Sequence, residues 1–409
     1  MRRNLYIIFC LVLLGVSCES IRKANPYEDS LNVLRVDIVY PDGFGNAPHE
    51  GIEVLVEDIA SGARYVGRTD ASGEAGFNVP DGLYRVNASA KMATDMFNGA
   101  ADKVAVTGGS VELLLPMVHS KTGVIVIKEL YCGGCKKLPQ EGNYQSDQYM
   151  ILHNNDYEVQ YLDSLCIGTM APYNSNGVNY FVSKDPESGT TVYPEFVPII
   201  QAIWQFPGDG RSFPLQPGED AVVCFRGAVD HTVQYPLSVN LNRPECFVCY
   251  NPTYFPNTEY HPAPGDMVSQ SRYLDVVIKT GQANAYTLSI SSPALMVFRS
   301  SGISMQDYVR QADNITPVPG SAVDNVIKIP YEWVMDAVEV FDGRSADNSK
   351  RLSPVLDAGY VLQTDVFMGT SLMRHKDEDE SAKAGYEVLA DTNNSLQDFY
   401  ETTKQSLHE

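Results

Sequence analysis

The sequence predicts an all-β protein made of two consecutive β-sandwich regions, with long loops and few short helices. From Leu31 onward, apolar and polar residues alternate with a period of two in short stretches, which is the pattern of half-buried strands. Turns rich in Gly, Pro and Asp-Gly separate these stretches at short intervals, as in sandwiches. A chain of 409 residues, 44% of them hydrophobic, exceeds one typical core, so we expect more than one domain.

The N-terminus predicts export and a lipid anchor. Basic residues open the chain, and the apolar stretch over 5–16 is too short to span a bilayer comfortably. The LGVSC segment that follows resembles the bacterial lipobox, whose cysteine, here Cys18, becomes the acylated first residue of the mature chain. We expect a signal peptide over 1–17 and a polar tether over 18–30; an ordinary signal peptide containing a cysteine is the alternative. By resemblance to lipoprotein sorting, Glu19 implies the outer membrane and leaves the leaflet open.

The first predicted sandwich covers residues 31–119 and contains six or seven short strands. Within it, the segment from Gly51 to Val86, with a T-D-x-x-G turn that ends at Gly73, resembles carboxypeptidase-regulatory or transthyretin-like domains. In that family the turn joins two strands, and glycine allows the positive φ that the turn needs. The resemblance implies a spacer or adhesive module and no activity.

The second predicted region covers residues 120–409. Its segments Tyr149–Asn155 and Leu162–Leu165 resemble the opening of the lamin-tail type of immunoglobulin-like sandwich. The order of motifs over residues 120–400 is similar to a Bacteroidetes lipoprotein family known as domain of unknown function 4876. That resemblance implies an envelope lipoprotein and supplies no assigned activity.

Helical signals are few. Residues Ser304–Ala312 predict a short helix with Ser304 as its N-cap. Residues Pro330–Val340 predict either a helix or a short turn into a strand. The acidic run at 377–380 is interpreted as a solvated loop between strands, and it lacks the spacing of a calcium loop.

Two C-x-x-C pairs, Cys132/Cys135 and Cys246/Cys249, are the candidates for disulfides or a metal site. Four thiolates at this spacing could bind zinc. Export favours oxidation over metal loading, and residues three apart in an extended segment point to opposite faces. We therefore expect at least one disulfide, with buried free thiols and a metal site as the alternatives, and the identity of any metal stays unknown.

Catalytic motifs are absent from the sequence. It contains no H-E-x-x-H, G-x-S-x-G, P-loop or G-x-G-x-x-G pattern, so we predict that the protein is not an enzyme and needs no cofactor. Without the two arginines of the signal, 28 basic residues face 51 acidic ones, a formal charge of −23. Such a charge repels nucleic acid, so none is expected as a partner.

Tyrosine-bearing loops predict a binding surface. Many of the 24 tyrosines lie near residues 171–185 and 251–266, among Asn, Pro and Gly. Tyrosine offers a large contact area at low entropic cost, and loops on a rigid sandwich can vary without disturbing its core. The candidate ligand-binding residues are Tyr173, Tyr180, Tyr250, Tyr254, Tyr260 and His261. The alternative is that these aromatic residues cover sheet edges.

The leading hypothesis is a non-enzymatic cell-envelope lipoprotein that binds a ligand or an outer-membrane partner through loops of the second sandwich. The family resemblance implies a TonB-dependent receptor as that partner, in the uptake of nutrients or metal complexes. An extracellular hydrolase acting on a polymer and a structural adhesin or assembly factor are the alternatives.

Overall fold

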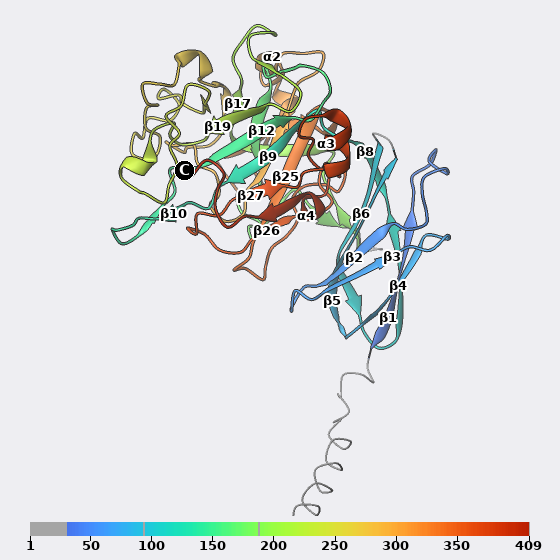
Figure 1. Cartoon of the computed structure of the whole chain (residues 1–409). Coiled ribbons are helices and arrows are strands. Elements are labelled where there is room, and N and C mark those ends of the chain that lie inside the picture. The colour runs from blue at the N-terminus through green and yellow to red at the C-terminus, as the bar shows by residue number, and fades with distance from the viewer. Residues whose placement is uncertain (1–30, 93–94, 187–188, 409) are drawn as a thin grey trace, which may run out of the picture.

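The computed structural model describes residues 31–92, 95–186 and 189–408. They form two β regions that lie side by side, the first in blue and cyan and the second from green to red (Figure 1). The prediction of an all-β protein with sandwich architecture and few short helices is confirmed. The predicted signal peptide, tether and lipid anchor at Cys18 lie outside the described residues. No helix in the described ranges is long and apolar enough to cross a membrane.

The first region is a sandwich of two sheets. One sheet, in the order β4–β1–β7, consists of β1 (Asn32–Val39), β4 (Glu74–Val79) and β7 (Ser110–Pro116). The other, in the order β3–β2–β5–β6–β8, consists of β2 (Glu53–Asp58), β3 (Arg64–Arg68), β5 (Gly82–Met92), β6 (Asp95–Val106) and β8 (Val118–Lys121). Alternation places every second side chain in the core between the sheets: Leu34, Val36 and Ile38 of β1 are buried there.

The turn before β4 has the geometry that its sequence predicts. Gly73 adopts a φ of +91°, and a Cβ at this position would lie 3.2 Å from Ile38 Cγ1. The Asp70 carboxylate accepts hydrogen bonds from the backbone N–H groups of Ser72 at 2.8 Å and Glu74 at 3.1 Å. The Ser72 hydroxyl, which donates to the same carboxylate at 2.6 Å, and these backbone bonds favour the charged form and lower the pKa of Asp70.

The second region is a larger sandwich. Its six-stranded sheet, in the order β20–β19–β12–β9–β27–β28, consists of β9 (Ile125–Tyr131), β12 (Tyr149–Asn154), β19 (Asp220–Cys224), β20 (Phe247–Val248), β27 (Leu372–Arg374) and β28 (Phe399–Glu401). Its eight-stranded sheet follows the order β23–β24–β17–β14–β22–β25–β26, and the eighth strand, β21, pairs with β17. These strands are β14 (Cys166–Met170), β17 (Phe196–Gln205), β21 (Asp275–Lys279), β22 (Ala294–Phe298), β23 (Ile315–Pro317), β24 (Asn325–Pro330), β25 (Val334–Asp342) and β26 (Val361–Gln363).

Short elements connect these sheets. Two-residue strands pair as β10 (Cys135–Lys136) with β11 (Asn143–Tyr144), β13 (Gln160–Tyr161) with β18 (Pro214–Leu215), and β15 (Ser183–Lys184) with β16 (Thr191–Val192). Single 3-10 turns are η1 (His231–Val233), η2 (Gln270–Arg272), η3 (Ala312–Asn314) and η4 (Tyr331–Trp333). The short helices are α2 (Met305–Tyr308), α3 (Glu378–Ala384) and α4 (Ser395–Asp398).

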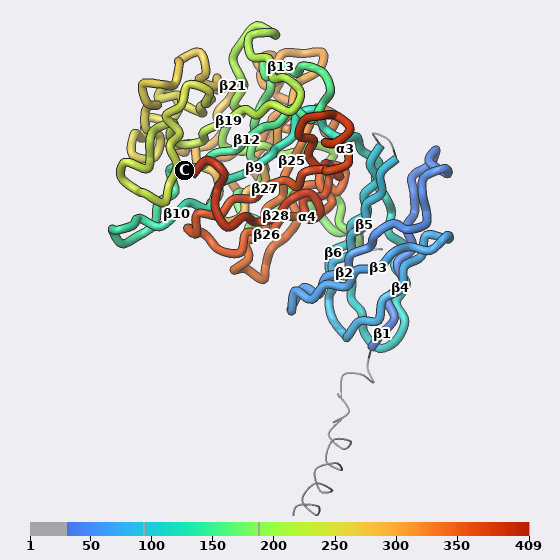
Figure 2. Tube along the Cα trace, viewed as in Figure 1, coloured from blue at the N-terminus to red at the C-terminus, as the bar shows by residue number. Residues whose placement is uncertain are grey.

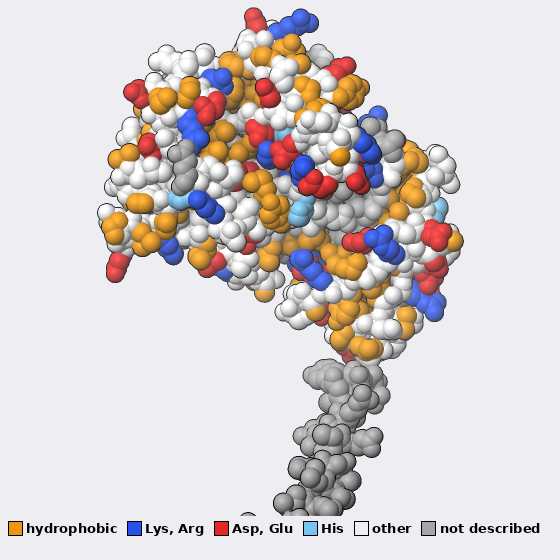
Figure 3. Space-filling model, viewed as in Figure 1, with side chains coloured by type: hydrophobic (Ala, Val, Ile, Leu, Met, Phe, Trp, Pro, Cys, Tyr) orange, Lys and Arg blue, Asp and Glu red, His pale blue; other side chains and the backbone are white. Residues whose placement is uncertain are grey.

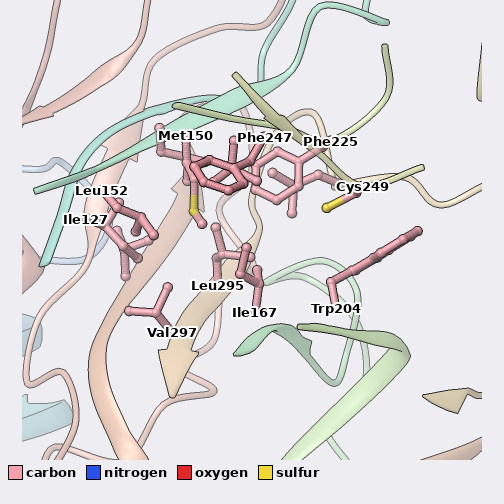
Figure 4. Packing of buried hydrophobic residues seen from close by; sticks show 14 of the residues in the cluster. Ile127, Met150, Leu152, Ile167, Trp204, Phe225, Phe247, Cys249, Leu295 and Val297 are labelled. Atoms are coloured by element: carbon pink, nitrogen blue, oxygen red, sulfur yellow. The ribbon is translucent and has the colours of Figure 1, made fainter. Parts of the chain in front are cut away.

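The main core lies between the two large sheets (Figure 4). Side chains from β9 and β12, such as Ile127 and Met150, meet Ile167, Leu295 and Val297 from β14 and β22. In Figure 4, Trp204 and Ile127 lie at opposite ends of the group of labelled side chains. The candidate site described below includes Trp204.

Loops form a third layer over the outer face of the six-stranded sheet. All six residues of β12 are buried, because Met150 and Leu152 face the main core while Tyr149 and Ile151 pack under the loop that carries Val239 and other apolar residues. A strand covered on both sides reads as a continuous apolar run rather than an alternating one. These loops, yellow-green in Figure 1, also carry most of the predicted binding residues.

Two of the helical predictions agree with the structure. The Ser304 side chain accepts a hydrogen bond from the Asp307 N–H at 3.1 Å, so it caps α2 as predicted. The segment from Pro330 is the predicted turn into a strand: Pro330 ends β24, η4 follows, and β25 begins at Val334.

The interpretation of residues 377–380 as a loop was wrong, because they begin helix α3. Asp377 is the N-cap, and its carboxylate accepts from the Glu380 N–H at 3.0 Å. Carboxylates in the first turn interact favourably with the positive end of the helix dipole, and Gly385 ends the helix with a φ of +79°.

The loop over residues 391–394 joins the two regions. Asn98 donates to the Thr392 carbonyl at 2.7 Å, Asn394 donates to Ser89 Oγ at 3.0 Å, and Asn393 donates to the Lys121 carbonyl at 3.1 Å. In Figure 2 this C-terminal part of the chain, in red, approaches the ends of the cyan strands of the first region. Directional hydrogen bonds therefore fix how the regions sit relative to each other.

Candidate functional site

The loop over residues 250–261 gathers four of the six predicted binding residues. Tyr250 stacks on His261 with 5.3 Å between ring centroids, and Tyr260 lies directly before His261 in the chain. Tyr254 is partly exposed on the same loop, and its carbonyl accepts from Lys279 at 2.9 Å.

The two remaining tyrosines lie in different surroundings. Tyr173 lies largely buried near the base of the 250–261 loop, donating to or accepting from Thr287 Oγ1 at 3.1 Å, and it interacts electrostatically with Arg226. Tyr180 is exposed. Among the described residues, no hydrogen bond or ring contact joins it to the other five predicted binding residues. The structure therefore separates Tyr180 from this candidate site.

His261 is a buried, neutral donor. It is 1% exposed and packs against Phe255 and Trp204, with ring centroids 5.5 and 6.2 Å away. Its Nε2 accepts the backbone N–H of Asn251 at 3.2 Å, which leaves the proton on Nδ1. Burial and the nearby charge of Arg226 lower the pKa of His261 to about 4. The Nδ1–H group has no hydrogen-bond partner among the described residues.

Arg226 lies beneath Tyr260 and is 2% exposed. Its Nη1 donates to the Gln145 carbonyl at 3.0 Å and its Nε to the Tyr260 carbonyl at 3.4 Å. The Tyr260 ring covers the guanidinium, with 5.3 Å from Cζ to the ring centroid. Its Nη2 has no partner in the described chain. Burial lowers the pKa of Arg226, yet a guanidinium keeps its charge in proteins, so a cation is buried here without a hydrogen-bonded carboxylate.

Three further buried groups lack a partner for one atom: Trp204 Nε1, whose ring packs beside His261, and Gln148 Oε1 and Asp147 Oδ1, which follow Gln145, whose carbonyl Arg226 contacts. Gln148 is held by donation from its Nε2 to the Cys132 carbonyl at 2.8 Å. The other oxygen of Asp147 accepts from Tyr131 at 3.0 Å and Ser238 at 2.6 Å. Burial raises the pKa of Asp147, which favours its neutral form.

We call these five residues the Arg226 cluster; they are Asp147, Gln148, Trp204, Arg226 and His261. They hold five of the eight buried side-chain atoms without a partner in the described part of the chain. Buried polar groups in folded proteins are normally hydrogen-bonded, and each exception needs an explanation. Arg226 Nη2, Trp204 Nε1 and His261 Nδ1 are donors, Gln148 Oε1 is an acceptor, and Asp147 Oδ1 carries the proton when that carboxyl is neutral.

The cysteines do not form the expected disulfide within a C-x-x-C pair. All six described cysteines are free and buried. Cys249 faces the main core, whereas Cys246 lies on the other side of its strand beside Cys224. Cys132 donates to Gln363 Oε1 at 2.9 Å and Cys135 to Asp147 Oδ2 at 3.6 Å. Because the two side chains of each pair point in different directions, the alternative of buried free thiols describes this structure.

A metal site is likewise not formed by the cysteines in the described ranges. Three other ligand-type side chains do come together, namely His153, Asp220 and Glu387. Lys128 donates to Asp220 at 2.7 Å and also bonds Glu387, while His153 Nδ1 lies 2.6 Å from Asp220. The lysine ammonium therefore takes the place that a cation would occupy.

The fold resembles that of a solved protein. A DUF4876 family protein from Bacteroides thetaiotaomicron VPI-5482 matches with a TM-score of 0.56 and 22% identity, over 91% of this chain and 96% of the other. A second match, the Bacillus anthracis TIE protein, has a TM-score of 0.18 and 12% identity over 74% of this chain and 48% of the other, and it carries no argument. No curated protein matches the chain.

The sequence also matches a family model. Residues 216–406, which include Arg226 and the 250–261 loop, match the family described as Protein of unknown function (DUF4876). The resemblance predicted from the order of motifs is confirmed. Over residues 216–406, the chain is therefore similar to the DUF4876 family.

Proposed function

We propose that the protein is a non-enzymatic cell-envelope lipoprotein that binds a small anionic ligand through Arg226, beneath the tyrosine-bearing loops of its second region. The observation that supports this proposal is the buried guanidinium with an unpartnered Nη2. A buried charge without a paired partner costs several kcal/mol, on the order of 3 to 5 when a pair is broken. An anionic oxygen at this position would offset that cost.

The donors and acceptors of the Arg226 cluster favour a particular class of ligand. Arg226 Nη2, His261 Nδ1 and Trp204 Nε1 can donate to a carboxylate. The unpartnered Oε1 of Gln148 can accept from a hydroxyl or ammonium group. A small hydroxy- or amino-carboxylate offers both, so we propose this class.

Tyrosines around the cluster would contact the body of the ligand. Tyr260 already covers the guanidinium, and Tyr250 stacks on His261. Aromatic anchors of this kind contribute on the order of 2 kcal/mol each when buried against a partner. Anchoring at Cys18 would hold the protein at the membrane, where an outer-membrane TonB-dependent receptor is the partner that the family resemblance implies.

Binding of hydroxy- and amino-carboxylates to the purified full-length protein in detergent tests the proposal. We expect at least one to raise the melting temperature of the wild type and to bind by calorimetry, and we expect Arg226→Met to abolish both effects. Arg310→Met is the matched control, because Arg310 is exposed and pairs with Asp307 at 2.9 Å. The control should bind like the wild type.

Two results would count against this function. One is equal binding by wild type and Arg226→Met, which would place the ligand elsewhere. The other is failure of every carboxylate to bind the wild type. Replacing a buried charge by an apolar residue of similar length is often tolerated, so Arg226→Met should fold, and its melting curve verifies this.

A further inference from the structure

A cavity of about 620 Å³ lies between the two regions, and its lining includes no residue of the Arg226 cluster. Its walls come from β5, β6 and β7 of the first region and from residues 193–195, Tyr331, Phe341 and 350–360 of the second. This volume lies in the range of small-molecule sites, which often form between domains. The surface around the two regions carries interspersed acidic and basic side chains on the face shown in Figure 3.

Strand alternation directs Asn87 of β5 toward this cavity. Tyr84, Val86 and Ala88 point into the core of the first sandwich, so the intervening Arg85 and Asn87 point outward to the second region. Asn87 is 5% exposed, and its Oδ1 has no partner in the described residues. A buried acceptor therefore faces the cavity without a donor.

The aromatic wall of the cavity is held in a fixed arrangement. Phe341 and Tyr360 stack with 4.0 Å between centroids and 13° between planes. The Arg85 guanidinium lies 5.3 Å from each centroid, and its Nε donates to Asp102 at 3.1 Å. Because Asp102 neutralises Arg85, this wall presents apolar surface without a free charge.

The other polar groups at the wall include a phenol, a paired lysine and the charged side chains of Lys103, Lys184 and Glu195. Tyr193 lines the cavity, and burial together with nearby acidic residues raises its pKa, so the hydroxyl keeps its proton. Lys350 donates to the Gly359 carbonyl at 2.5 Å and lies 3.9 Å from Glu339. Its charge is therefore compensated within the protein.

We propose that this cavity binds a small, uncharged, largely aromatic molecule whose N–H or O–H group donates to Asn87 Oδ1. The cavity supplies a flat apolar wall and an unpartnered acceptor, and the charges of Arg85 and Lys350 beside them are compensated within the protein. The chemistry differs from that of the Arg226 cluster, which is cationic. The site is therefore independent of the proposed function.

Indole is a suitable probe, and 1-methylindole, which lacks the N–H donor, is its matched control. We expect equilibrium dialysis with the full chain to show indole binding more tightly than 1-methylindole by about 2- to 10-fold, the value of one neutral hydrogen bond. Asn87→Leu should remove this preference. Ala100→Trp should block both probes, because Ala100 pairs with Asn87 across β5 and β6 and lines the same cavity.

Variants elsewhere separate this proposal from the first. Arg226→Met should bind indole like the wild type. Equal binding of the two probes by the wild type, unchanged binding by Ala100→Trp, or no binding of indole at millimolar concentration would each overturn the proposal. Melting curves of Asn87→Leu and Ala100→Trp must show folded protein, and Arg226→Met supplies the folded reference variant.

Discussion

Arg374 is buried among three aspartates in the second region. Its guanidinium lies 2.5 Å from Asp336, 3.3 Å from Asp398 and 3.6 Å from Asp391. One cation cannot neutralise three buried carboxylates. Burial, opposed by the charge of Arg374 and reinforced by repulsion from Asp391, raises the pKa values of Asp336 and Asp398 to about 7. This group of carboxyls therefore takes up protons near neutral pH.

Stability should fall as pH rises through 7. The pKa of these carboxyls is higher in the folded chain than the usual 3.8, so their protonation stabilises the fold. That contribution is complete below the unfolded pKa and is lost as pH rises through the folded pKa. We expect the free energy of unfolding, measured with urea, to decrease by about 1 to 3 kcal/mol between pH 6 and pH 8.

A variant pair isolates the origin of this pH dependence. Asp398→Asn should reduce the slope of the free energy of unfolding against pH, because it removes one of the titrating carboxyls. Asp307→Asn should leave the slope unchanged, since Asp307 is exposed and bonds Arg310 at the surface. A slope that Asp398→Asn leaves intact would assign the titration to other groups.

The six cysteines of the described chain should be free thiols in the folded protein. We expect alkylation in denaturant without a reductant, followed by mass spectrometry, to label all six. Fewer labels would contradict the structure. The loss of two labels at Cys224 and Cys246 would point to the two sulfurs that lie in contact.

At this scale the sequence predicts Tyr250, Tyr260 and His261, which the structure brings together, but it wrongly adds Tyr180 and misses Arg226. Composition marks the loops, because Tyr among Asn, Pro and Gly is distinctive at short range. Arg226 follows β19 in a segment with no local sign of burial. It is buried by residues near 145 and 260, and such distant contacts leave no pattern in the neighbouring sequence.

At the scale of elements, a strand is easier to predict from the sequence when one of its faces is buried than when both are. In β1 of the first region, alternation is preserved because one face meets the core and the other is more exposed. In β12, β14 and β22 every residue is buried, so alternation disappears and only an apolar run remains. The third layer of loops that buries the outer face of β12 was not predicted.

Helix α3 shows the same limit for a polar segment. Because the acidic run lacks apolar periodicity, it predicts a loop. Asp377, the acidic first turn and Gly385 are nevertheless all helix-terminus signals. We expect Asp377→Ala to lower the free energy of unfolding by about 1 kcal/mol, the usual value of an N-cap. Urea denaturation measures this change, and Asp42→Ala, at an exposed turn position away from the helix, serves as the control. Equal stability of Asp377→Ala and the wild type would show that the cap contributes nothing.

At the scale of the whole molecule, hydrogen bonds from buried asparagines hold the two regions together. Asn98 is fully buried and donates to the Thr392 carbonyl, and residues 391–394 bond β5 and β8 as well. The sequence predicts two regions and a boundary at residue 119, whereas β8 continues to Lys121. It does not predict the contact, because its partners lie nearly 300 residues apart.

Asn98→Ala should loosen this contact. Removing the side chain leaves the Thr392 carbonyl without its donor, which costs about 1 to 3 kcal/mol. We expect faster proteolysis between the regions and a broader distribution of distances in small-angle scattering. Asn176→Ala, at an exposed loop position, should behave like the wild type. Identical scattering from Asn98→Ala and the wild type would mean that other contacts suffice to hold the regions.

Asp391 belongs both to the buried charge group around Arg374 and to the connection between the regions, since its carboxylate accepts the Gly123 N–H at 2.5 Å. Separation of the regions that displaces Gly123 breaks this bond, and proton uptake is then thermodynamically linked to their relative placement. Linkage is reciprocal: a force that separates the regions must change the proton affinity of the buried carboxyls by the same coupling free energy. A force applied to one region would then change the protonation of the carboxyls around Arg374.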